Sequence, residues 1–388
     1  MSAAEKPTLG IAMVGHGLMG RAHSHAWRNV AAIFDLPVTP VMTVLCGRDG
    51  VAVERARRWL RWNDASTDWH TAIERPDVQL VDICTPSASH PEIALAALAA
   101  GKHVLCEKPL ANSLTEAEAM AQGAAQALQV GARSMVGFNY RRVPAVELAR
   151  QIIAVGRLGE IRHVRAQYLQ EWLVDPAFPL TWRLTQEEAG SGALGDLASH
   201  LVDLTTHLLA DEITSVSSLL RTFVGERPFP APRSDPDAVA RSPGAHGAVT
   251  VDDASLFLAQ FSLGGVGSFE ATRVAAGNKK AMKIEINGTA GSLRFNVERL
   301  NELELFEGGD DAGFRTILVT EPRHPWMSGW PAGHVIGWEH TFVHQARDLL
   351  TAIGEDRDVF PDFGDGLQTQ RVLAAVETAH RSRRWEPV

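Results

Sequence analysis

The stretch Leu9-Gly10-Ile11-Ala12-Met13-Val14-Gly15-His16-Gly17-Leu18-Met19-Gly20 joins an apolar run to three glycines in the pattern G-x-G-x-x-G. The apolar run predicts a buried strand, and the residues from there to about Phe34 predict a helix. The glycines allow a tight turn, a close approach of the backbone to a pyrophosphate, and close packing of helix on strand. Free N–H groups at the start of the helix then face the phosphates. The segment therefore predicts a dinucleotide-binding turn, with the cofactor against Gly15, Gly17, Leu18, Met19 and Gly20.

The alternation of apolar runs and helical stretches continues through the first third of the chain. Further runs occur at 41–46, 81–84, 103–106 and 134–138, and helical stretches separate them at 91–100 and 114–128. Wholly apolar short strands that alternate with helices predict a parallel sheet covered on both faces. We therefore expect an α/β fold class with a doubly wound Rossmann domain over residues 1–143.

After about Pro144 the pattern changes to longer strands with imperfect alternation. These strands are expected at 161–172, 213–223, 254–262 and 281–286, with a helix at 195–209 and a helical tail from about 337. The pairs Gly264-Gly265 and Asn287-Gly288 are hairpin signals. Residues 144–388 therefore predict a C-terminal α+β domain with a large open, mainly antiparallel sheet. The Pro- and Gly-rich stretch 225–249 predicts a long surface loop.

The composition is that of an ordinary globular chain of 388 residues, and its net charge is −9. This charge argues against a nucleic acid or an anionic membrane as partner, because both favour a basic face. No apolar run is long enough to span a bilayer, and the first residues lack the apolar segment of a signal peptide. Cys46, Cys84 and Cys106 lie in apolar runs, which is typical of reduced, buried thiols. We therefore expect a soluble cytoplasmic protein.

The end of the second predicted strand decides between NAD and NADP. An acid there would hydrogen-bond the ribose hydroxyls, but the sequence reads Cys46-Gly47-Arg48-Asp49. Arg48 would stack on the adenine or pair with a 2′-phosphate, unless it is an ordinary solvated residue at a helix start. Asp49, one step further, would still reach the ribose. The choice stays open, with a slight lean to NADP.

Two further strand ends carry polar side chains that would line the cofactor crevice. Thr85-Pro86 and His90 follow the third apolar run, and His90 would alternatively cap or pack its helix. Glu107-Lys108-Pro109 follows the next run, where Lys108 would donate a hydrogen bond to a substrate hydroxyl rather than remain a solvated charge. We expect the Lys108–Pro109 peptide bond to be cis, because the chain must turn sharply directly after a central strand.

The segment from Gly192 to Asp203 carries the candidate base. Asp196 and His200 stand four residues apart, so on a helix they project from one face. A histidine is the natural base for an alcohol proton, and a neighbouring aspartate orients the ring or the substrate. The alternatives are a surface ion pair, or a metal pair with His340 and His344 as distant ligands. We expect no metal, because hydride transfer to nicotinamide needs none.

Taken in order, GHGLMG, TPSASHPEIALAALAAGKHVLCEKPLA, FNYRR and GDLASHLVD resemble the Gfo/Idh/MocA oxidoreductase family. YLQEW, TWRL, GSGALGD, VDDA and EATR resemble its levoglucosan dehydrogenase branch. The resemblance implies catalysis by Lys108, Asp196 and His200. It implies cofactor contacts at the glycine loop, Arg48, Thr85, Pro86, His90, Glu107 and Lys108. It also places Arg141 or Arg142 beside the cleft. Asn139, Trp182 and Arg183 border the cleft as well, and these three are assigned to the cofactor.

The combined interpretation is an NAD(P)-dependent dehydrogenase of a sugar, glycoside or inositol-type polyol. His200 would take the hydroxyl proton, Lys108 would steady the alkoxide, and Asp196 would orient its neighbours. Arg141, Gln170 and Trp172 are expected to contact the carbohydrate, and a homodimer or homotetramer is expected to form through the C-terminal sheet. A redox-elimination glycosidase with tightly bound NAD⁺ and a non-catalytic sensor of the same fold remain as alternatives.

Overall fold

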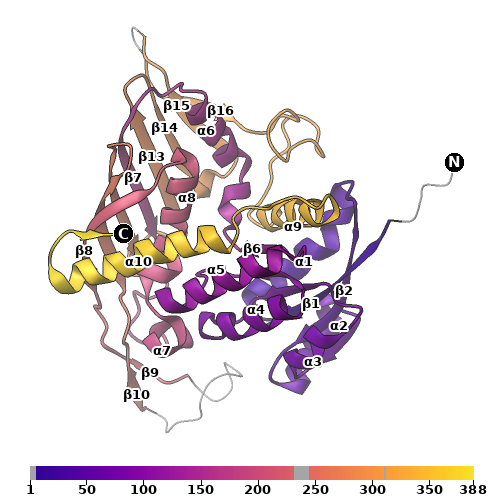
Figure 1. Ribbon diagram of the computed structural model, residues 1–388. Helices are drawn as coiled ribbons and strands as arrows, with labels where there is room; N and C mark the ends of the chain where they lie inside the picture. The colour runs from indigo at the N-terminus through magenta and orange to yellow at the C-terminus, as the bar shows by residue number, and fades with distance from the viewer. Residues whose placement is uncertain (1–5, 231–243, 310–311) are drawn as a thin grey trace. The chain divides into compact units, whose positions relative to one another are not determined.

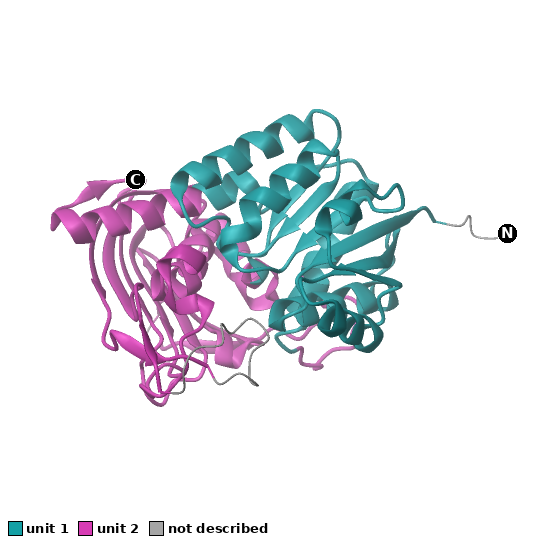
Figure 2. Ribbon diagram, turned by 90° about the horizontal axis from the view of Figure 1, so that it is seen from below, with its two compact units in different colours: residues 1–139, 337–367 teal, residues 140–336, 368–388 magenta. Residues whose placement is uncertain are grey.

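The computed structural model describes residues 6–230, 244–309 and 312–388, and it forms two compact units (Figures 1 and 2). Unit 1 comprises residues 1–139 and 337–367, and unit 2 comprises residues 140–336 and 368–388. The sequence placed everything after residue 143 in one domain, whereas residues 337–367 belong to unit 1. The reason is helix α9 (His340–Gly354), which buries Phe342 and Leu349 in the same apolar cluster as α1 (Leu18–Ile33).

Unit 1 is built on a six-stranded parallel sheet in the order β3-β2-β1-β4-β5-β6. The strands are β1 Thr8–Val14, β2 Thr39–Cys46, β3 Asp64–Ser66, β4 Leu80–Ile83, β5 His103–Cys106 and β6 Ser134–Val136. This order is that of a dinucleotide-binding Rossmann sheet, so the predicted fold class is confirmed. Strand β3 and helix α3 (Trp69–Glu74) were not predicted, because elements of three and six residues carry almost no periodic signal.

Helices cover both faces of this sheet. They are α1, α2 Gly50–Leu60, α3, α4 His90–Ala99, α5 Leu114–Leu128 and α9. Alternate residues of β1 serve opposite faces: Ile11 and Met13 pack in one apolar cluster, and Ala12 and Val14 pack in the other. Because every residue from Leu9 to Val14 is buried, the strand reads as a continuous apolar run.

Unit 2 is built on a nine-stranded sheet in the order β16-β15-β14-β13-β7-β12-β11-β8-β17. Its strands are β7 Ile161–Leu169, β8 Ile213–Arg221, β11 Ala254–Phe261, β12 Val266–Thr272, β13 Ala281–Gly288, β14 Ser292–Asn296, β15 Glu302–Phe306, β16 Arg315–Leu318 and β17 Glu386–Pro387. Every described neighbouring pair in it is antiparallel except β7 with β12. The helices of the unit are α6 Pro144–Ala154, α7 Gln186–Ala189, α8 Ser199–Leu209 and most of α10 Phe363–Ser382.

Both predicted hairpins form, with one difference in the second. Gly264 and Gly265 lie in the turn between β11 and β12. Asn287, however, pairs with Ser292 and Gly288 ends β13, so the β13–β14 turn runs over the following residues rather than centring on Asn287-Gly288. In the predicted loop 225–249, strands β9 (Glu226–Pro228) and β10 (His246–Ala248) pair antiparallel, and residues 231–243 lie outside the described residues.

The predicted helix 195–209 has an unexpected start. Residues Leu194–Ala198 form a π-helical turn, and the α-helical part, α8, begins at Ser199. Such turns are rare and often mark functional sites. In the parts of the chain that the structure covers, no helix is long and apolar enough to cross a membrane. Cys46, Cys84 and Cys106 are free thiols; Cys46 and Cys106 are buried, as expected, whereas Cys84 is only partly buried.

Candidate active site

The glycine loop of unit 1 has the geometry that the sequence predicts. Gly15 has φ +101°, a conformation that side chains rarely adopt, and a Cβ there would lie 2.7 Å from the carbonyl oxygen of Cys84. A Cβ at Gly20 would lie 2.2 Å from the carbonyl oxygen of Gly15, so helix and strand pack closely at this point. A Cβ at Gly17 would meet open space, which leaves the backbone accessible there. Each glycine therefore performs one of the three tasks expected for a pyrophosphate-binding turn.

The N-terminus of α1 is open to an anion. Gly17 is the N-cap without a side-chain hydrogen bond, and no acidic residue lies in the first turn. The helix dipole and its first N–H groups therefore favour negative charge at this end. The loop follows β1, and Thr85 follows the adjacent strand β4, so both lie at the carboxyl edge of the two central strands. These residues fit the pyrophosphate of a dinucleotide.

Asp49, the acidic residue nearest the end of β2, caps the helix that follows. The Asp49 carboxylate is the N-cap of α2 and accepts hydrogen bonds from the N–H groups of Val51 at 2.8 Å and Ala52 at 3.0 Å. These backbone hydrogen bonds lower the pKa of Asp49. Arg48, one residue earlier, is exposed. One carboxylate oxygen of Asp49 is therefore held by the helix, and Arg48 is an exposed charged side chain at the strand end.

His90 performs the packing role that the sequence offered as its alternative. The imidazole is buried, with Nδ1 3.0 Å from the carbonyl oxygen of Pro109 and Nε2 3.1 Å from that of Thr85. Burial lowers the pKa of His90 despite these two contacts. The side chain thus ties the loop after β4, which includes Pro86, to the loop after β5. Asn139, also predicted at the cofactor, is buried and donates to the Thr341 hydroxyl at 2.7 Å.

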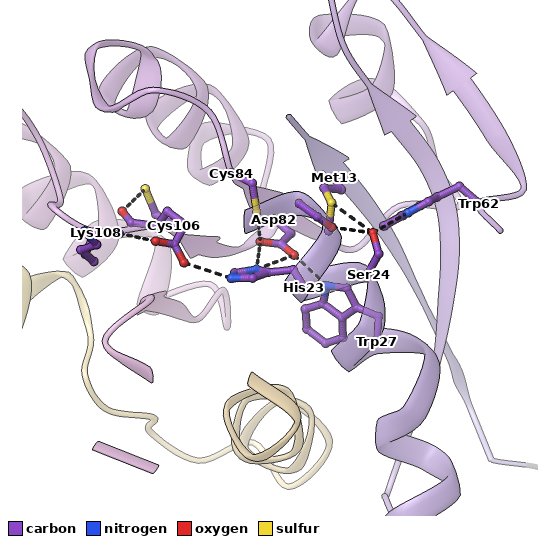
Figure 3. A network of polar contacts seen from close by, with 11 residues as sticks. Met13, His23, Ser24, Trp27, Trp62, Asp82, Cys84, Cys106 and Lys108 are labelled. Atoms are coloured by element: carbon purple, nitrogen blue, oxygen red, sulfur yellow. Dashed lines mark hydrogen bonds and ion pairs between the residues drawn. The ribbon is translucent and has the colours of Figure 1, made fainter. Parts of the chain in front are cut away.

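Glu107 and Lys108 follow β5, and the Lys108–Pro109 peptide bond is cis, as predicted. Glu107 is buried rather than directed to solvent. Its Oε1 lies 3.0 Å from Nε2 of His23, and its Oε2 accepts the Lys108 N–H at 3.2 Å (Figure 3). The Glu107 carboxylate therefore belongs to a buried polar network inside unit 1, a role that the sequence did not indicate.

In unit 2, His200 is enclosed by aromatic rings. It is 8% exposed, its ring centroid lies 5.0 Å from that of Tyr140 and 6.1 Å from that of Tyr168, and the two hydroxyls are 3.2 Å apart. The chain contains only these two tyrosines. Burial, followed by the neighbouring Tyr140 and the charge of Asp196, raises the pKa of Tyr168 well above its usual range. The Tyr168 phenol therefore stays neutral, and both tyrosines offer hydroxyl groups beside the candidate base.

The turn that carries Asp196 is held by Asp252, which precedes β11, and by Arg273, which follows β12. The Asp252 carboxylate accepts from the N–H groups of Gly192 at 2.7 Å and Leu194 at 2.9 Å, and its carbonyl accepts from Nη2 of Arg273 at 2.8 Å. Arg273 is fully buried; burial lowers its pKa, and the negative charge of Asp196 acts against that shift. The guanidinium of Arg273 thus lies close enough to interact with the charge of Asp196.

Arg141 forms a buried ion pair with Asp203. Its guanidinium donates to Asp203 through Nη2 at 2.6 Å and through Nε at 3.0 and 3.2 Å. Asp203 lies one turn after His200 on α8, so the pair fixes this helix to the segment that carries Tyr140. Bidentate pairs of this kind give geometric specificity. The structure accordingly gives Arg141 a partner in the protein where the sequence assigned a sugar contact.

The remaining predicted residues form an aromatic region of unit 2. Trp172 donates to Oε1 of Gln170 at 2.8 Å and packs against Phe178 at 5.2 Å between ring centroids. Arg183 lies over the Trp182 ring at 4.3 Å. Sequence reasoning missed Tyr140 and Tyr168 as neighbours of His200, and Arg273 as a neighbour of Asp196. The sequence offered one indication of these residues. The two tyrosines and the VDDA and EATR segments belong to the stretches that resemble the family, yet no role was assigned to them.

Comparisons with known proteins agree with this architecture. Residues 9–138 match an oxidoreductase family with an NAD-binding Rossmann fold, and residues 146–294 match the GFO/IDH/MocA C-terminal domain. A levoglucosan dehydrogenase from Pseudarthrobacter phenanthrenivorans is 40% identical over 388 residues, with 98% of each chain covered.

Two solved structures are similar over the same extent. An oxidoreductase domain protein from Kribbella flavida has a TM-score of 0.93 and 56% identity, covering 98% of this chain and 99% of its own. A levoglucosan dehydrogenase in complex with NADH and levoglucosan has a TM-score of 0.91 and 38% identity, with the same coverage. The chain therefore belongs to the Gfo/Idh/MocA family of oxidoreductases, and its first unit carries the NAD-binding Rossmann fold of that family.

Proposed function

We propose that the protein is an NAD(P)-dependent dehydrogenase that oxidises a ring secondary alcohol of a sugar, glycoside or inositol-type polyol to a ketone. The observation that carries the proposal is the enclosed His200, with Asp196 on the preceding π turn, in a chain that also has an intact dinucleotide loop. The levoglucosan dehydrogenase noted above supports an anhydrosugar or another pyranose as the substrate.

In this mechanism the protein removes the hydroxyl proton of the substrate and stabilises the negative charge that develops on the substrate oxygen. His200 accepts the hydroxyl proton of the substrate, and a positioned base of this kind contributes about 10²–10⁴-fold in rate. Lys108 donates a hydrogen bond to the substrate oxygen as negative charge develops on it. The bound nicotinamide supplies the hydride acceptor for the carbinol carbon. Asp196, near the buried Arg273, orients His200 or a neighbouring sugar hydroxyl.

The aromatic region of unit 2 suits a sugar. Trp172 and Trp182 offer ring faces to the apolar C–H surface of a pyranose, and Gln170 offers an amide to a hydroxyl group. The Trp172 indole N–H is satisfied by Gln170, so the pair is already oriented before a ligand arrives. Such preorganisation reduces the entropic cost of binding.

We also propose that the chain forms a homodimer or homotetramer through the sheet of unit 2 and acts in the cytoplasm. Leu219, Leu256 and Leu258 are 49%, 42% and 53% exposed, and Leu219 pairs with Leu256 across β8 and β11. Neighbouring exposed leucines on one sheet face favour burial against a second copy of the same sheet. Three free cysteines are typical of a reducing compartment.

The experiment is a screen of anhydrosugars, monosaccharides, glycosides and inositols with NAD⁺ and NADP⁺, followed at 340 nm. The proposal expects a rise in absorbance that matches the ketone formed. Glycoside cleavage without a net change at 340 nm would instead favour the redox-elimination glycosidase. Cofactor binding without reduction by any compound would favour the non-catalytic sensor.

A further inference from the structure

A buried histidine of α1 connects two acidic residues in the centre of unit 1. His23 is 2% exposed and lies one turn after Gly20. Its Nδ1 lies 2.9 and 3.0 Å from the two carboxylate oxygens of Asp82, and its Nε2 lies 3.0 Å from Oε1 of Glu107 (Figure 3). Asp82 belongs to β4, and Glu107 directly follows β5. The imidazole therefore joins two neighbouring strands of the sheet through their carboxylates.

Both ring nitrogens of His23 face a carboxylate oxygen within hydrogen-bonding distance. An ionised carboxylate only accepts hydrogen bonds, and a neutral imidazole has a single N–H. Burial alone would lower the pKa of His23, but the charge of Asp82 and the interactions with Asp82 and Cys84 outweigh it, and the pKa is raised well above its usual range. The network thus places a histidine that favours its protonated form between two buried carboxyl groups.

Asp82 connects the network to α1, and Glu107 connects it to the backbone of Lys108. Asp82 also accepts from the Trp27 indole at 2.7 Å, which fixes the carboxylate against α1. At the other end, Oε2 of Glu107 accepts the backbone N–H of Lys108 at 3.2 Å. A Cβ at Gly137 would lie 2.8 Å from Oε1 of Glu107, so this glycine leaves the space that the carboxylate fills. The side chain of Glu107 has little room to reorient while the imidazolium is present.

We propose that His23 is a positioning residue: as a buried imidazolium it holds the Glu107 carboxylate, and through it the backbone that aims Lys108. The proposal rests on the dehydrogenase function proposed above, because Lys108 acts there on the substrate oxygen. His23 touches neither substrate nor cofactor in this account. Its effect on turnover passes through Glu107.

The same side chains do not suit a metal ion. The ligand atoms of His23, Asp82 and Cys84 lie within 4.8 Å of one another. A histidine ligand, however, needs a free lone pair, and both ring nitrogens of His23 carry protons. Burial, together with the charge of Asp82, also raises the pKa of the Cys84 thiol, which disfavours the thiolate that a metal would bind. The cluster is therefore a hydrogen-bonded ionic cluster that connects two strands.

The test compares His23→Gln with Trp62→Phe in the full-length protein. Trp62 is also buried and hydrogen-bonds Ser24 on α1 at 3.0 Å, but it contacts neither carboxylate. We expect His23→Gln to lower kcat by at least about 10-fold at pH 8–9 while KM for the cofactor stays within about threefold. The ratio of variant to wild-type kcat should rise as the pH falls, because a proton on one of the two carboxyl groups then replaces the lost imidazolium charge.

Trp62→Phe should give a kcat ratio that does not vary with pH. A pH-independent loss in His23→Gln, equal to that of the control, would overturn the positioning role. Should His23→Gln fail to fold, the ¹⁵N resonances of the His23 ring in the wild-type protein decide the matter. A doubly protonated ring at pH 8 supports the proposal, and a neutral ring overturns it. Absence of any dehydrogenase turnover in wild-type protein with a doubly protonated His23 would refute the proposed function alone.

Discussion

His200 is flanked by two aromatic rings and is followed on α8 by a buried ion pair. Tyr140 and Tyr168 flank the ring, and burial keeps the Tyr168 phenol neutral. Asp203, one turn further along α8, is neutralised by Arg141 rather than by His200. The base is therefore positioned by aromatic packing on its sides and by a separate ion pair behind it. A substrate hydroxyl remains the proton donor that this account assigns to it.

His200→Ala and Lys108→Ala should each lower kcat by at least about 10²-fold, because one removes the base and the other the donor to the developing alkoxide. The dissociation constant of the cofactor should change little in both variants. Steady-state kinetics and a fluorescence titration of the reduced cofactor measure the two quantities. Near-normal turnover in either variant would remove that residue from the mechanism. His334→Ala, an exposed histidine of unit 2, is the matched control and should leave kcat unchanged.

Cofactor choice should depend on Arg48, because it is an exposed cation at the end of β2, whereas Asp49 already caps α2 through Oδ1. If Arg48 pairs with a 2′-phosphate, Arg48→Ala should weaken NADP by about 1–3 kcal/mol and NAD by much less. Calorimetric titration of both cofactors into the wild type and the variant gives the comparison. Equal losses for both would show that Arg48 stacks on the adenine. Tighter binding of NAD by the wild type would contradict the lean to NADP.

At the scale of elements, periodic segments were predictable and local irregularities were not. Helix α5 was expected at its observed bounds, because its apolar positions and its Ser113 cap are visible in the sequence. The π turn at 194–198 was not, because it depends on Asp252, which lies more than fifty residues away and binds the turn through its carboxylate. Likewise, the commitment of Arg141 to Asp203 and of Glu107 to His23 follows from long-range packing that spacing alone does not reveal.

The junction of β5 and β6 gives an element-scale prediction about acid stability. Nδ1 of His103 accepts the Arg133 N–H at 3.0 Å, and burial together with the Arg133 charge lowers the pKa of His103 to about 4. A histidine with a lowered pKa contributes stability above its ordinary value near 6.5, and that contribution is lost as the pH falls toward 4. Between pH 7 and 4.5 the wild type should lose about 2–3 kcal/mol more unfolding free energy than His103→Asn.

Urea denaturation at several pH values measures this difference. Asparagine keeps an acceptor near the Arg133 N–H but does not titrate. In His103→Asn the free energy of unfolding should therefore fall less steeply as the pH decreases, which is the acid limb of the stability curve. His334→Asn removes an exposed histidine and should leave the limb as it is in the wild type. An unchanged limb in His103→Asn would show that other groups control acid stability.

At the scale of the whole molecule, the sheet face of unit 2 should control assembly. The double variant Leu256→Lys/Leu258→Lys places two charges on the exposed leucines of β11 and should convert a homo-oligomer to monomers. Light scattering coupled to size exclusion gives the mass directly. Leu128→Lys, which changes an exposed leucine at the end of α5 in unit 1, is the control and should leave the mass unchanged. A wild-type monomer, or an oligomer unaffected by the double variant, would refute assembly through this face.

The central claim is that the protein transfers a hydride from a ring carbon of a sugar to the nicotinamide of the cofactor. Its most direct test is a reaction with levoglucosan deuterated at its ring carbons, analysed by mass spectrometry of cofactor and sugar. The account predicts that each reduced cofactor carries one deuterium, that an equal amount of keto-sugar forms, and that His200→Ala abolishes both. Deuterium lost to solvent, or a sugar cleaved while the cofactor stays oxidised, would contradict net hydride transfer as the function of this protein.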